Sequence, residues 1–506
     1  MMIRQRWCEM TLFTRFIQSL YKKSLKYKGS QENLTKQANA KPSLRHTLQE
    51  FADCADLNQR TYPELDVVTV FFGHLVDDEK LNRDVVTPLS QATPANISKL
   101  FKQTQFKYVN DSKVLVNGIL SGSVAIFHGN ASYLIDVYGP VARSIAQSET
   151  ETVITGPHDA FTEQAGSNLS LIRARLKSSH LKIVKLNVGE ITKTETYVLY
   201  IQDIVNMDYV QELINRIKNI ETDAIYDANM LIQIIDDNPN SIFPQFITTE
   251  RPDAAVSKLA DGKVLCIIDG SPSVVSVPTS FFEFFTSSDD YYQRWAIGSA
   301  TRFLRFIAFV ITITFTAVYV SITTFHYEMI PENLLLSLTE SRSKVPFPPL
   351  YEALLMETTI ELLREAGARL PTKIGQTIGI VGGIVIGSSA VQAGFTSNIL
   401  VIAVASSAIA SFVIPSYVMS ASIRFVRFGL IILAGVLGNF GLAVGIAAVA
   451  IHLSGLTSLG TSYVTPVAPF QITDWKDIFI RAPFWFIRKR PTQSKSRNEV
   501  RNKMRK

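Results

Sequence analysis

Three stretches in the second half of the chain contain no Asp, Glu, Lys, Arg or His, and they constrain the fold more than any other feature. They cover residues 306–325, 374–423 and 428–451. A helix needs about 20 apolar residues to cross roughly 30 Å of hydrocarbon, and each stretch meets that length. The first 290 residues contain no such run. The sequence therefore predicts a soluble half followed by a membrane half, and it excludes a purely soluble protein.

The charge-free stretches divide into four predicted membrane spans, which cover about residues 303–324, 374–393, 398–420 and 425–453. The fourth is long for a single crossing. Its Gly438-Asn-Phe-Gly441 segment predicts a break into two half-helices, an arrangement that is common where backbone lines a cavity. The predicted transmembrane domain as a whole covers residues 291–487.

Basic residues flank the predicted spans and indicate their orientation. Arg294, Arg302 and Arg305 precede the first span, and a basic tail follows the last. The positive-inside rule therefore predicts that both termini lie in the cytoplasm, which requires an even number of crossings. Arg424 and Arg427 then fall on the outer side if all four spans are complete. Either one segment is re-entrant or these two arginines are buried in protein contacts.

The net charge of +6 on 506 residues comes from two basic tails. Residues 1–28 hold seven basic residues and one acidic residue, and residues 488–506 hold nine and one, so the remainder is acidic. Charge distributed in this way favours a membrane surface over nucleic acid as the partner. Residues 1–30 are interpreted as a basic amphipathic tail, with a disordered start as the alternative, and residues 488–506 as a basic cytoplasmic tail.

The first half of the chain is predicted to form two soluble α/β lobes, at residues 31–145 and 146–290, followed by an all-α multi-span membrane domain. Strands are expected at 66–72, 114–138, 181–188 and 195–204, and helices at 43–55, 162–177, 208–220 and near 228–235. Gly118, Gly122 and Gly129 are expected to break the stretch at 114–138 into hairpins. A weak internal echo relates residues 121–130 to 261–270, because each contains a glycine, an apolar strand and a tight turn.

The soluble half shows little that could carry catalysis. It contains no metal-spaced His/Glu pair, no glycine-rich loop ending in Lys-Ser/Thr and no nucleophile elbow. Three widely spaced cysteines exclude a disulfide scaffold and a cysteine-based zinc cluster. Asp289 and Asp290 could hold a cation, but a solvated junction before the membrane is the favoured interpretation. We therefore expect no enzymatic activity, no cofactor and no bound metal.

The second predicted span carries two distinct faces. Gly375, Gly379, Gly383 and Gly387 recur every four residues and form a strip on which neighbouring helices can approach closely. A second face is polar at both ends and aliphatic in the middle, and it holds Thr377, Val381, Ile384, Ser388 and Gln392. In a ring of identical subunits the glycines would pack against neighbours, and the second face would line a pore. The alternative is an ordinary buried helix packed within one subunit.

The loop between the first two spans contains a predicted helix at 351–366. Glu357, Glu361 and Glu365 are spaced four residues apart, so they share one face of that helix. Repeated around a ring, these carboxylates would concentrate cations at a pore mouth. A solvated acidic face without that role is the competing interpretation.

Many short motifs follow one another in the order found in a known family. They are Gly156-Pro157 with Phe161 and Asn168, Leu171-Ile-Arg-Ala-Arg-Leu-Lys177, Glu250-Arg-Pro-Asp253, Asp269-Gly-Ser-Pro272 with Pro278, Asp289-Asp-Tyr-Tyr292, Arg302 with Arg305, Val345-Pro-Phe-Pro348, Glu365-Ala-Gly367 with Arg369 and Pro371, Val381-Gly-Gly-Ile-Val-Ile-Gly387, and Asp477 with Arg481 and Pro483. From about residue 66 to 491 the chain resembles the A subunits of the spore germination receptors of endospore-forming bacteria, the GerA family.

That resemblance implies a receptor in the inner membrane of the dormant spore. The A subunit would work with a permease-like B subunit that senses nutrient and with a lipoprotein C subunit. It would form a homo-oligomer, a pentamer by resemblance, that releases monovalent cations when nutrient binds. Three other functions remain open at this stage. They are an amplifier channel that responds to released ions, a solute transporter that uses the broken fourth span, and a scaffold for partner proteins.

Overall fold

The computed structural model describes residues 41–139, 148, 151 and 153–502, with the backbone alone for 372–381. The chain divides into two compact units. The first contains residues 1–144 and 166–184, and the second contains 145–165 and 185–506. The predicted lobe boundary at 145 is therefore crossed by residues 166–184, which group with the first unit. The predicted amphipathic tail at 1–30 lies outside the described residues.

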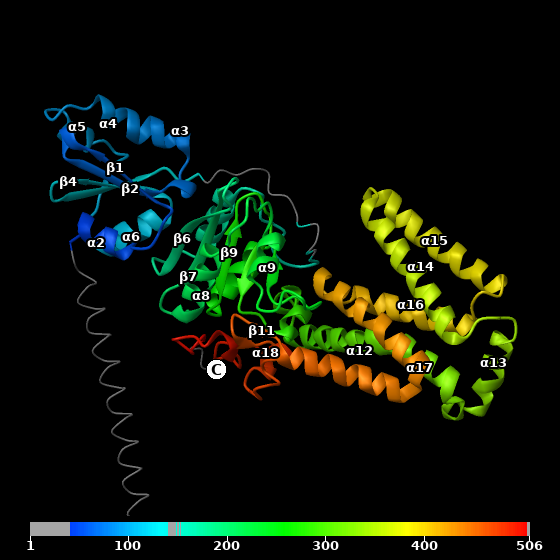
Figure 1. Ribbon diagram of the computed structural model, residues 1–506. Helices are drawn as coiled ribbons and strands as arrows, with labels where there is room; N and C mark the ends of the chain where they lie inside the picture. The colour runs from blue at the N-terminus through cyan, green and yellow to red at the C-terminus, as the bar shows by residue number, and fades with distance from the viewer. Residues whose placement is uncertain (1–40, 140–147, 149–150, 152, 503–506) are drawn as a thin grey trace, which may run out of the picture. The chain divides into compact units, whose positions relative to one another are not determined.

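The first unit is built on a five-stranded antiparallel sheet with the order β1-β2-β4-β5-β3. The strands are β1 (Leu57–Tyr62), β2 (Val67–Phe72), β3 (Lys107–Tyr108), β4 (Ser123–His128) and β5 (Ala131–Asp136). The helices are α2 (Leu44–Glu50), α3 (Asp78–Leu81), α4 (Thr87–Gln91), α5 (Ile97–Leu100), α6 (Ser112–Leu120) and α7 (Ala165–Arg175). Figure 1 shows α3, α4 and α5 on one side of this sheet and α2 and α6 on the other.

Both faces of this sheet are buried, and the side chains of each strand alternate between them. Phe71 and Val124 join one apolar cluster with Leu89 and Phe101, whose helices cover that face. Their neighbours along the strands, such as Phe72, join the opposite cluster with helix α6. Successive side chains of a strand point to opposite faces, so one strand supplies two separate cores.

The second unit begins with a sheet of the same topology. Its order is β6-β7-β9-β10-β8, from strands β6 (Leu181–Val188), β7 (Thr194–Ile201), β8 (Ile247–Thr249), β9 (Val264–Ile268) and β10 (Val274–Val277). Adding five to each strand number of the first sheet reproduces this order. Gly122 and Gly262 hold left-handed φ angles of +87° and +86° just before β4 and β9. The internal echo therefore marks a structural repeat, and the predicted α/β class is confirmed for this half.

One predicted strand in the first lobe is a helix instead. The stretch at 114–138 was expected to be hairpin strands throughout, but its first part forms α6. The carboxylate of Asp111 accepts a hydrogen bond from the Lys113 amide and caps this helix. Leu115 and Ile119, four residues apart, are both fully buried. A helix cap followed by apolar residues four positions apart favours a helix. The strand prediction failed because it relied only on the many residues in this stretch that favour strands.

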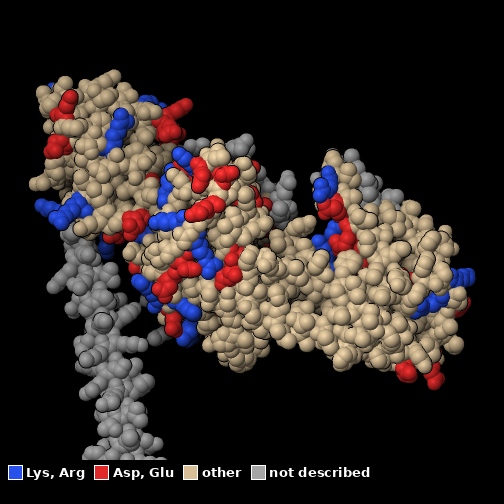
Figure 2. Space-filling model, in the orientation of Figure 1, with Lys and Arg blue, Asp and Glu red and all other residues tan. Residues whose placement is uncertain are grey.

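The rest of the second unit is helical apart from short strands. Helices α8 (Met207–Lys218), α9 (Ala228–Ile235), α10 (Pro252–Ala260) and α11 (Asp289–Tyr292) belong to its lobe. The region beyond contains α12 (Trp295–Phe325), α13 (Glu332–Arg342), α14 (Pro349–Arg369), α15 (Thr372–Gln392), α16 (Asn398–Phe412), α17 (Tyr417–Gly455) and α18 (Trp475–Ile478). On the face shown in Figure 2, charged side chains are dense over the lobe and sparse over these helices.

The predicted span boundaries need correction around Pro415. The third span was expected at 398–420, but α16 ends at Phe412, and α17 runs without the predicted gap from Tyr417. Pro415 lacks an amide hydrogen, and the Ser416 hydroxyl accepts the Met419 amide and caps the next helix. Within the described residues, α12 and α17 are long and apolar enough to cross a membrane, while α16 has 15 residues.

The basic tail that the sequence predicts at 488–506 makes specific contacts with the lobe in its described part. Up to residue 502 it packs on the lobe of its own unit. The Arg497 amide donates to Ile204 O at 2.9 Å, and the Arg490 Nε donates to Ala260 O at 2.7 Å. Arg501 forms an ion pair with Asp261 at 2.9 Å. One carbonyl and one carboxylate of the lobe therefore bind the guanidinium groups of Arg490 and Arg501, which the sequence assigned to a membrane surface.

A buried ion pair in the first unit provides a stability test. Arg173 donates to both carboxylate oxygens of Asp56 at 2.7 and 2.8 Å, and both side chains are 2% exposed. Replacing one partner leaves the other charge buried and unpaired. We therefore expect Asp56→Ala to lower the free energy of unfolding of this unit by about 3–5 kcal/mol. Hydrogen exchange of the β2 and β4 amides in urea measures this loss.

Two further variants make that test specific. Asp56→Ala combined with Arg173→Met removes both charges and should recover most of the loss. Asp84→Ala removes an exposed pair with Arg83 and should leave protection unchanged. Equal effects of Asp56→Ala and Asp84→Ala would contradict the structural role of the buried pair.

Candidate functional site

Helix α15 packs against α14 and leaves much of its surface open within one protomer. A Cβ placed on Gly382 would lie 2.9 Å from Leu363 Cδ1 of α14, so this glycine faces the contact. By contrast, a Cβ on Gly383 or Gly387 would meet no atom within 4 Å. Figure 1 shows α15 alongside α14, while α12, α16 and α17 run together. The alternative of a helix enclosed within its own subunit is therefore wrong for the described part of α15.

The structure places the predicted pore residues as follows. Ile384 is 66% exposed, and Ser388 and Gln392 are also exposed. Thr377 and Val381, together with Gly375 and Gly379, belong to the helix, but their surroundings lie outside the described residues. Exposed aliphatic groups on such a helix require lipid or another protein surface as a neighbour. Lining of a pore by this face stays a prediction.

Five charged side chains from α14 and α17 form a buried cluster beside α12 and α16. Its centre is Arg427, which forms an ion pair with Glu357 Oε2 at 2.7 Å and donates a hydrogen bond to Glu361 Oε1 at 3.2 Å, with Arg427 and Glu357 both fully buried. The other pairs are Arg424 with Glu361 at 3.2 Å and Arg364 with Glu361 at 3.2 Å. Burial of the two arginines in protein contacts, one of the two alternatives left open by the sequence, is therefore present, with Arg427 fully buried and Arg424 11% exposed.

Hydroxyl groups of the neighbouring helices complete the cluster. Thr316 of α12 donates to Glu357 Oε1 at 2.8 Å, and Ser407 of α16 accepts from Arg427 at 3.0 Å. Arg364 donates to the Ser411 hydroxyl of α16 at 2.9 Å. Four helices are thus tied together by charge-assisted bonds in an apolar setting, where such bonds are strong. Single hydroxyls in apolar stretches gave no sequence signal for this role.

The predicted acidic face of α14 must be corrected. Glu357 is buried, Glu361 is 25% exposed, and Glu365 is 57% exposed. Glu365 itself pairs with Arg369 at 2.6 Å. Each of the three carboxylates is therefore matched by an arginine, and Glu357 faces the helices rather than solvent. Within one protomer, this face of α14 is therefore not an open surface of unpaired negative charge.

The predicted break in the last span is present. Gly438 has φ of 62° and ψ of −145°, a conformation that only glycine adopts readily. A Cβ there would lie 2.9 Å from His326 Nε2 and 3.2 Å from Phe325. The following amide, of Asn439, lies 3.3 Å from His326 Nε2, and Ser321 donates to the Asn439 side chain at 2.7 Å. The C-terminal end of α12 therefore packs against the break in α17.

A second charge cluster joins the lobe to the start of α12. Asp290 is 1% exposed and accepts from Arg302 at 3.0 Å and from Arg305 at 2.8 Å. Tyr291 donates to Asp477 Oδ1 at 2.8 Å, and burial followed by the Asp477 charge raises the pKa of this phenol. The expectation of a solvated junction is wrong, because Asp290 is buried and neutralises two of the arginines on which the predicted orientation rests.

Comparisons with known proteins agree with the sequence resemblance. A family model described as the Bacillus/Clostridium GerA spore germination protein matches residues 45–493. Spore germination protein GerQA of Bacillus cereus is 42% identical over 441 residues, which cover 86% of this chain and 88% of the relative. Spore germination protein A1 of Bacillus subtilis strain 168 is 38% identical over 437 residues, covering 85% of this chain and 90% of the relative.

A solved structure is also similar in part. It is the N-terminal domain of the A subunit of the Bacillus megaterium spore germinant receptor GerK3, with 20% identity and a TM-score of 0.38. The match covers 48% of this chain and 98% of that domain.

The buried cluster predicts a sharp contrast between two glutamates on one helix. Glu357→Gln leaves Arg427 buried with Glu361, at 3.2 Å, as its remaining carboxylate partner, so we expect a loss of about 2–3 kcal/mol in stability. Glu365→Gln, on the exposed part of α14, should leave the melting temperature unchanged within about 1 °C. Thermal unfolding of the protein in nanodiscs measures both. Equal melting temperatures for the two variants would show that the Glu357 pair does not hold α14.

Proposed function

Because this chain belongs to the GerA family of spore germination proteins, we propose that it forms the cation-conducting part of a germination receptor. The family establishes a role in germination. The proposal adds that copies of the chain assemble into a ring and that α15 lines its axis. By resemblance the ring is a pentamer. It releases monovalent cations and carries no enzymatic activity.

The observation that supports the proposal most directly is the open surface of α15. A Cβ placed on Gly383 or Gly387 would meet no atom within 4 Å, although glycines in membrane helices commonly allow close helix packing. Ile384, on the neighbouring face, is 66% exposed. A second copy of the helix against the glycines would leave the Ile384 face directed at the axis. An aliphatic ring there closes a narrow passage by excluding water.

The rest of the receptor follows from the family resemblance. The B subunit, similar to permeases, senses nutrient, and the lipoprotein C subunit completes the complex. The receptor lies in the inner membrane of the spore, with the lobes and the C-terminal tail on the core side. Movement of α14 would shift α15, because α14 carries α15 on Leu363 and is held to α17 by Glu357.

Ion flux through the reconstituted receptor tests the pore assignment. Ile384→Ser or Val381→Ser places a polar group in the aliphatic ring, so we expect basal efflux of monovalent cations from proteoliposomes to rise about tenfold, equivalent to roughly 1.4 kcal/mol in the barrier. Ile409→Ser is the matched control, because Ile409 of α16 is also an isoleucine with 66% exposure. The pore assignment would be contradicted if the Ile384 and Val381 substitutions left basal cation efflux unchanged, or if Ile409→Ser raised it equally.

Glycine substitutions separate assembly from conduction. Gly383→Leu should weaken the ring and lower the yield of assembled oligomer. Gly429→Leu is its control, since a Cβ on Gly429 of α17 also meets no atom within 4 Å.

Saturable flux of a single solute would instead favour a transporter, and opening by released ions without nutrient would favour an amplifier. Lost partner recruitment with no conductance would favour a scaffold.

A further inference from the structure

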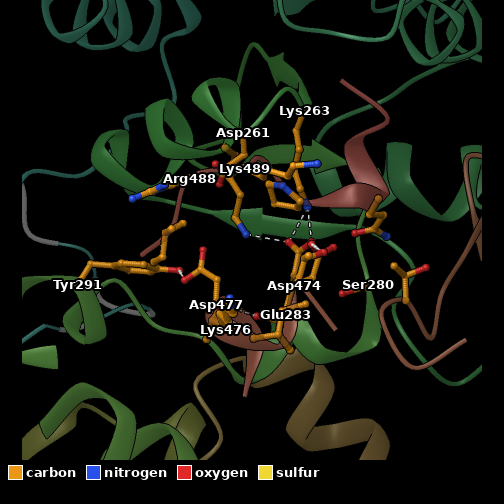
Figure 3. Close-up of a pocket in the computed structure, with 18 of the residues that line it drawn as sticks. Asp261, Lys263, Ser280, Glu283, Tyr291, Asp474, Lys476, Asp477, Arg488 and Lys489 are labelled. Atoms are coloured by element: carbon orange, nitrogen blue, oxygen red, sulfur yellow. Dashed lines mark hydrogen bonds and ion pairs between the residues drawn. The ribbon is translucent and has the colours of Figure 1, made fainter. Parts of the chain in front are cut away.

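A cavity of about 260 Å³ lies within the second unit, where three stretches of chain meet. Its lining comes from residues 258–291 of the lobe, 465–478 after α17, and 486–493 of the C-terminal tail. Figure 3 shows Lys263 reaching Glu283 and Tyr291 meeting Asp477, with Ser280 at another side of the cavity. The sequence pointed to no site at this place.

Two buried side chains of the lining have polar atoms without partners among the described residues. Gln493 is 3% exposed, and neither its Nε2 nor its Oε1 makes a hydrogen bond. Ser280 is 1% exposed, and its Oγ also lacks a partner. Leaving a buried donor or acceptor unpaired costs about 1–3 kcal/mol, so such groups in native proteins usually have a ligand or water. Both groups line the same cavity.

The tail is fixed at this position by its backbone rather than by Gln493. Tyr209 donates to Gln493 O at 3.1 Å. The adjacent Thr492 donates from its amide to Asp474 Oδ2 at 2.8 Å and from its hydroxyl at 2.6 Å. The side-chain amide of Gln493 is thus held in the lining, although it makes no hydrogen bond within the described part of the protein.

The lining holds five Lys or Arg side chains against four Asp or Glu side chains, so it carries a surplus of one positive charge. Lys258 and Lys263 both donate to the Glu283 carboxylate, at 2.7 Å and 2.5 Å. Burial opposes ionisation of Glu283, but the two ammonium groups outweigh it and lower its pKa to about 2. For Lys263, burial dominates over the attraction of Glu283 and lowers the pKa to about 8. The Glu283 carboxylate therefore forms ion pairs with two lysines, Lys263, which is buried, and Lys258, which is 22% exposed.

The other carboxylates of the lining each have a partner, which is an arginine for Asp261 and Asp477 and the uncharged Thr492 for Asp474. Asp261 pairs with Arg501 at 2.9 Å, Asp477 accepts from Tyr291 at 2.8 Å, and Asp474 accepts from Thr492. Lys476 and Arg488 also line the cavity, and neither has a carboxylate within 4.0 Å in the described part of the chain. Positive charge without a counterion attracts an anion.

We propose that this cavity binds a small anion of the carboxylate or phosphate class. The Gln493 amide and the Ser280 hydroxyl donate to its oxygens, and the lysines balance its charge. Carboxylate and phosphate oxygens form the strongest hydrogen bonds with such donors. Because the lining comes from the lobe, from the segment after α17 and from the tail, the bound anion stabilises the association of all three.

Thermal unfolding of the full chain in nanodiscs of neutral lipid tests the proposal. Sodium phosphate and sodium succinate are titrated separately at constant ionic strength, with sodium chloride as the reference salt. We expect a saturable rise in melting temperature with one or both anions, because a ligand that binds only the folded state stabilises it. Equilibrium dialysis with radiolabelled phosphate or succinate gives the affinity, and the two arms identify the oxyanion class.

Ser280→Ala and Gln493→Leu isolate the site without removing any bond within the protein. We expect each variant to keep the melting temperature of the parent in chloride and to bind the anion at least about tenfold more weakly. Gln233→Leu, on the exposed surface of α9, should bind as the parent does. If Gln493→Leu unfolds, Ser280→Ala still decides the question. Absence of saturable binding by both anions, or equal binding by the Ser280 variant and the parent, overturns the proposal.

Discussion

The ion pair between Glu357 and Arg427 determines how the helical part of this protein is arranged. Both side chains are fully buried, and their atoms lie 2.7 Å apart. A charge in an apolar setting requires a partner, so α14 is held beside α17 with its Glu357 face inward. Thr316 supports this pair from α12. Leu363 of α14 then contacts Gly382, and α15 lies on the side away from the bundle. The exposure of α15, on which the proposed conduction depends, is thus a consequence of one buried pair on its neighbour.

The same physical logic operates where the lobe meets the first long helix. Asp290 neutralises Arg302 and Arg305, which lie in the second and third turns of α12. Phe281 and Phe285 of the lobe belong to one apolar cluster with Ala317 and Val320 of that helix. A displacement of the lobe would therefore reach α12 and, through Thr316, the Glu357 pair. This continuity gives the proposed receptor a physical connection from soluble lobe to membrane helices.

Sequence patterns predicted the elements whose environment is uniform along their length. Charge-free stretches located α12 and α17, and short runs rich in apolar residues located β6 and β7, because an apolar environment faces each of these elements over much of its length. Gly438 was predicted as a break because few residues other than glycine adopt its backbone conformation. The failures involve residues whose role is decided by distant partners. Glu357 and Asp290 read as solvated carboxylates, since nothing near them in the sequence reveals Arg427 or Arg302. The docked tail was missed for the same reason, because its acceptors are backbone carbonyls.

Lipid and protein make different demands on the two faces of α15, and this difference bears on the proposed ring. A lipid chain satisfies Ile384 and Val385 adequately, because their side chains are as apolar as lipid. It satisfies a glycine face poorly, since an exposed glycine offers little surface for dispersion contacts. A neighbouring helix fits closely against glycines, and close backbone approach is the main source of helix affinity within lipid. The polar C-terminal end of the other face, at Ser388 and Gln392, in turn disfavours hydrocarbon and favours water or protein. An arrangement that places glycines against protein and Ser388 against water meets both demands at once, whereas a lone protomer in lipid meets neither.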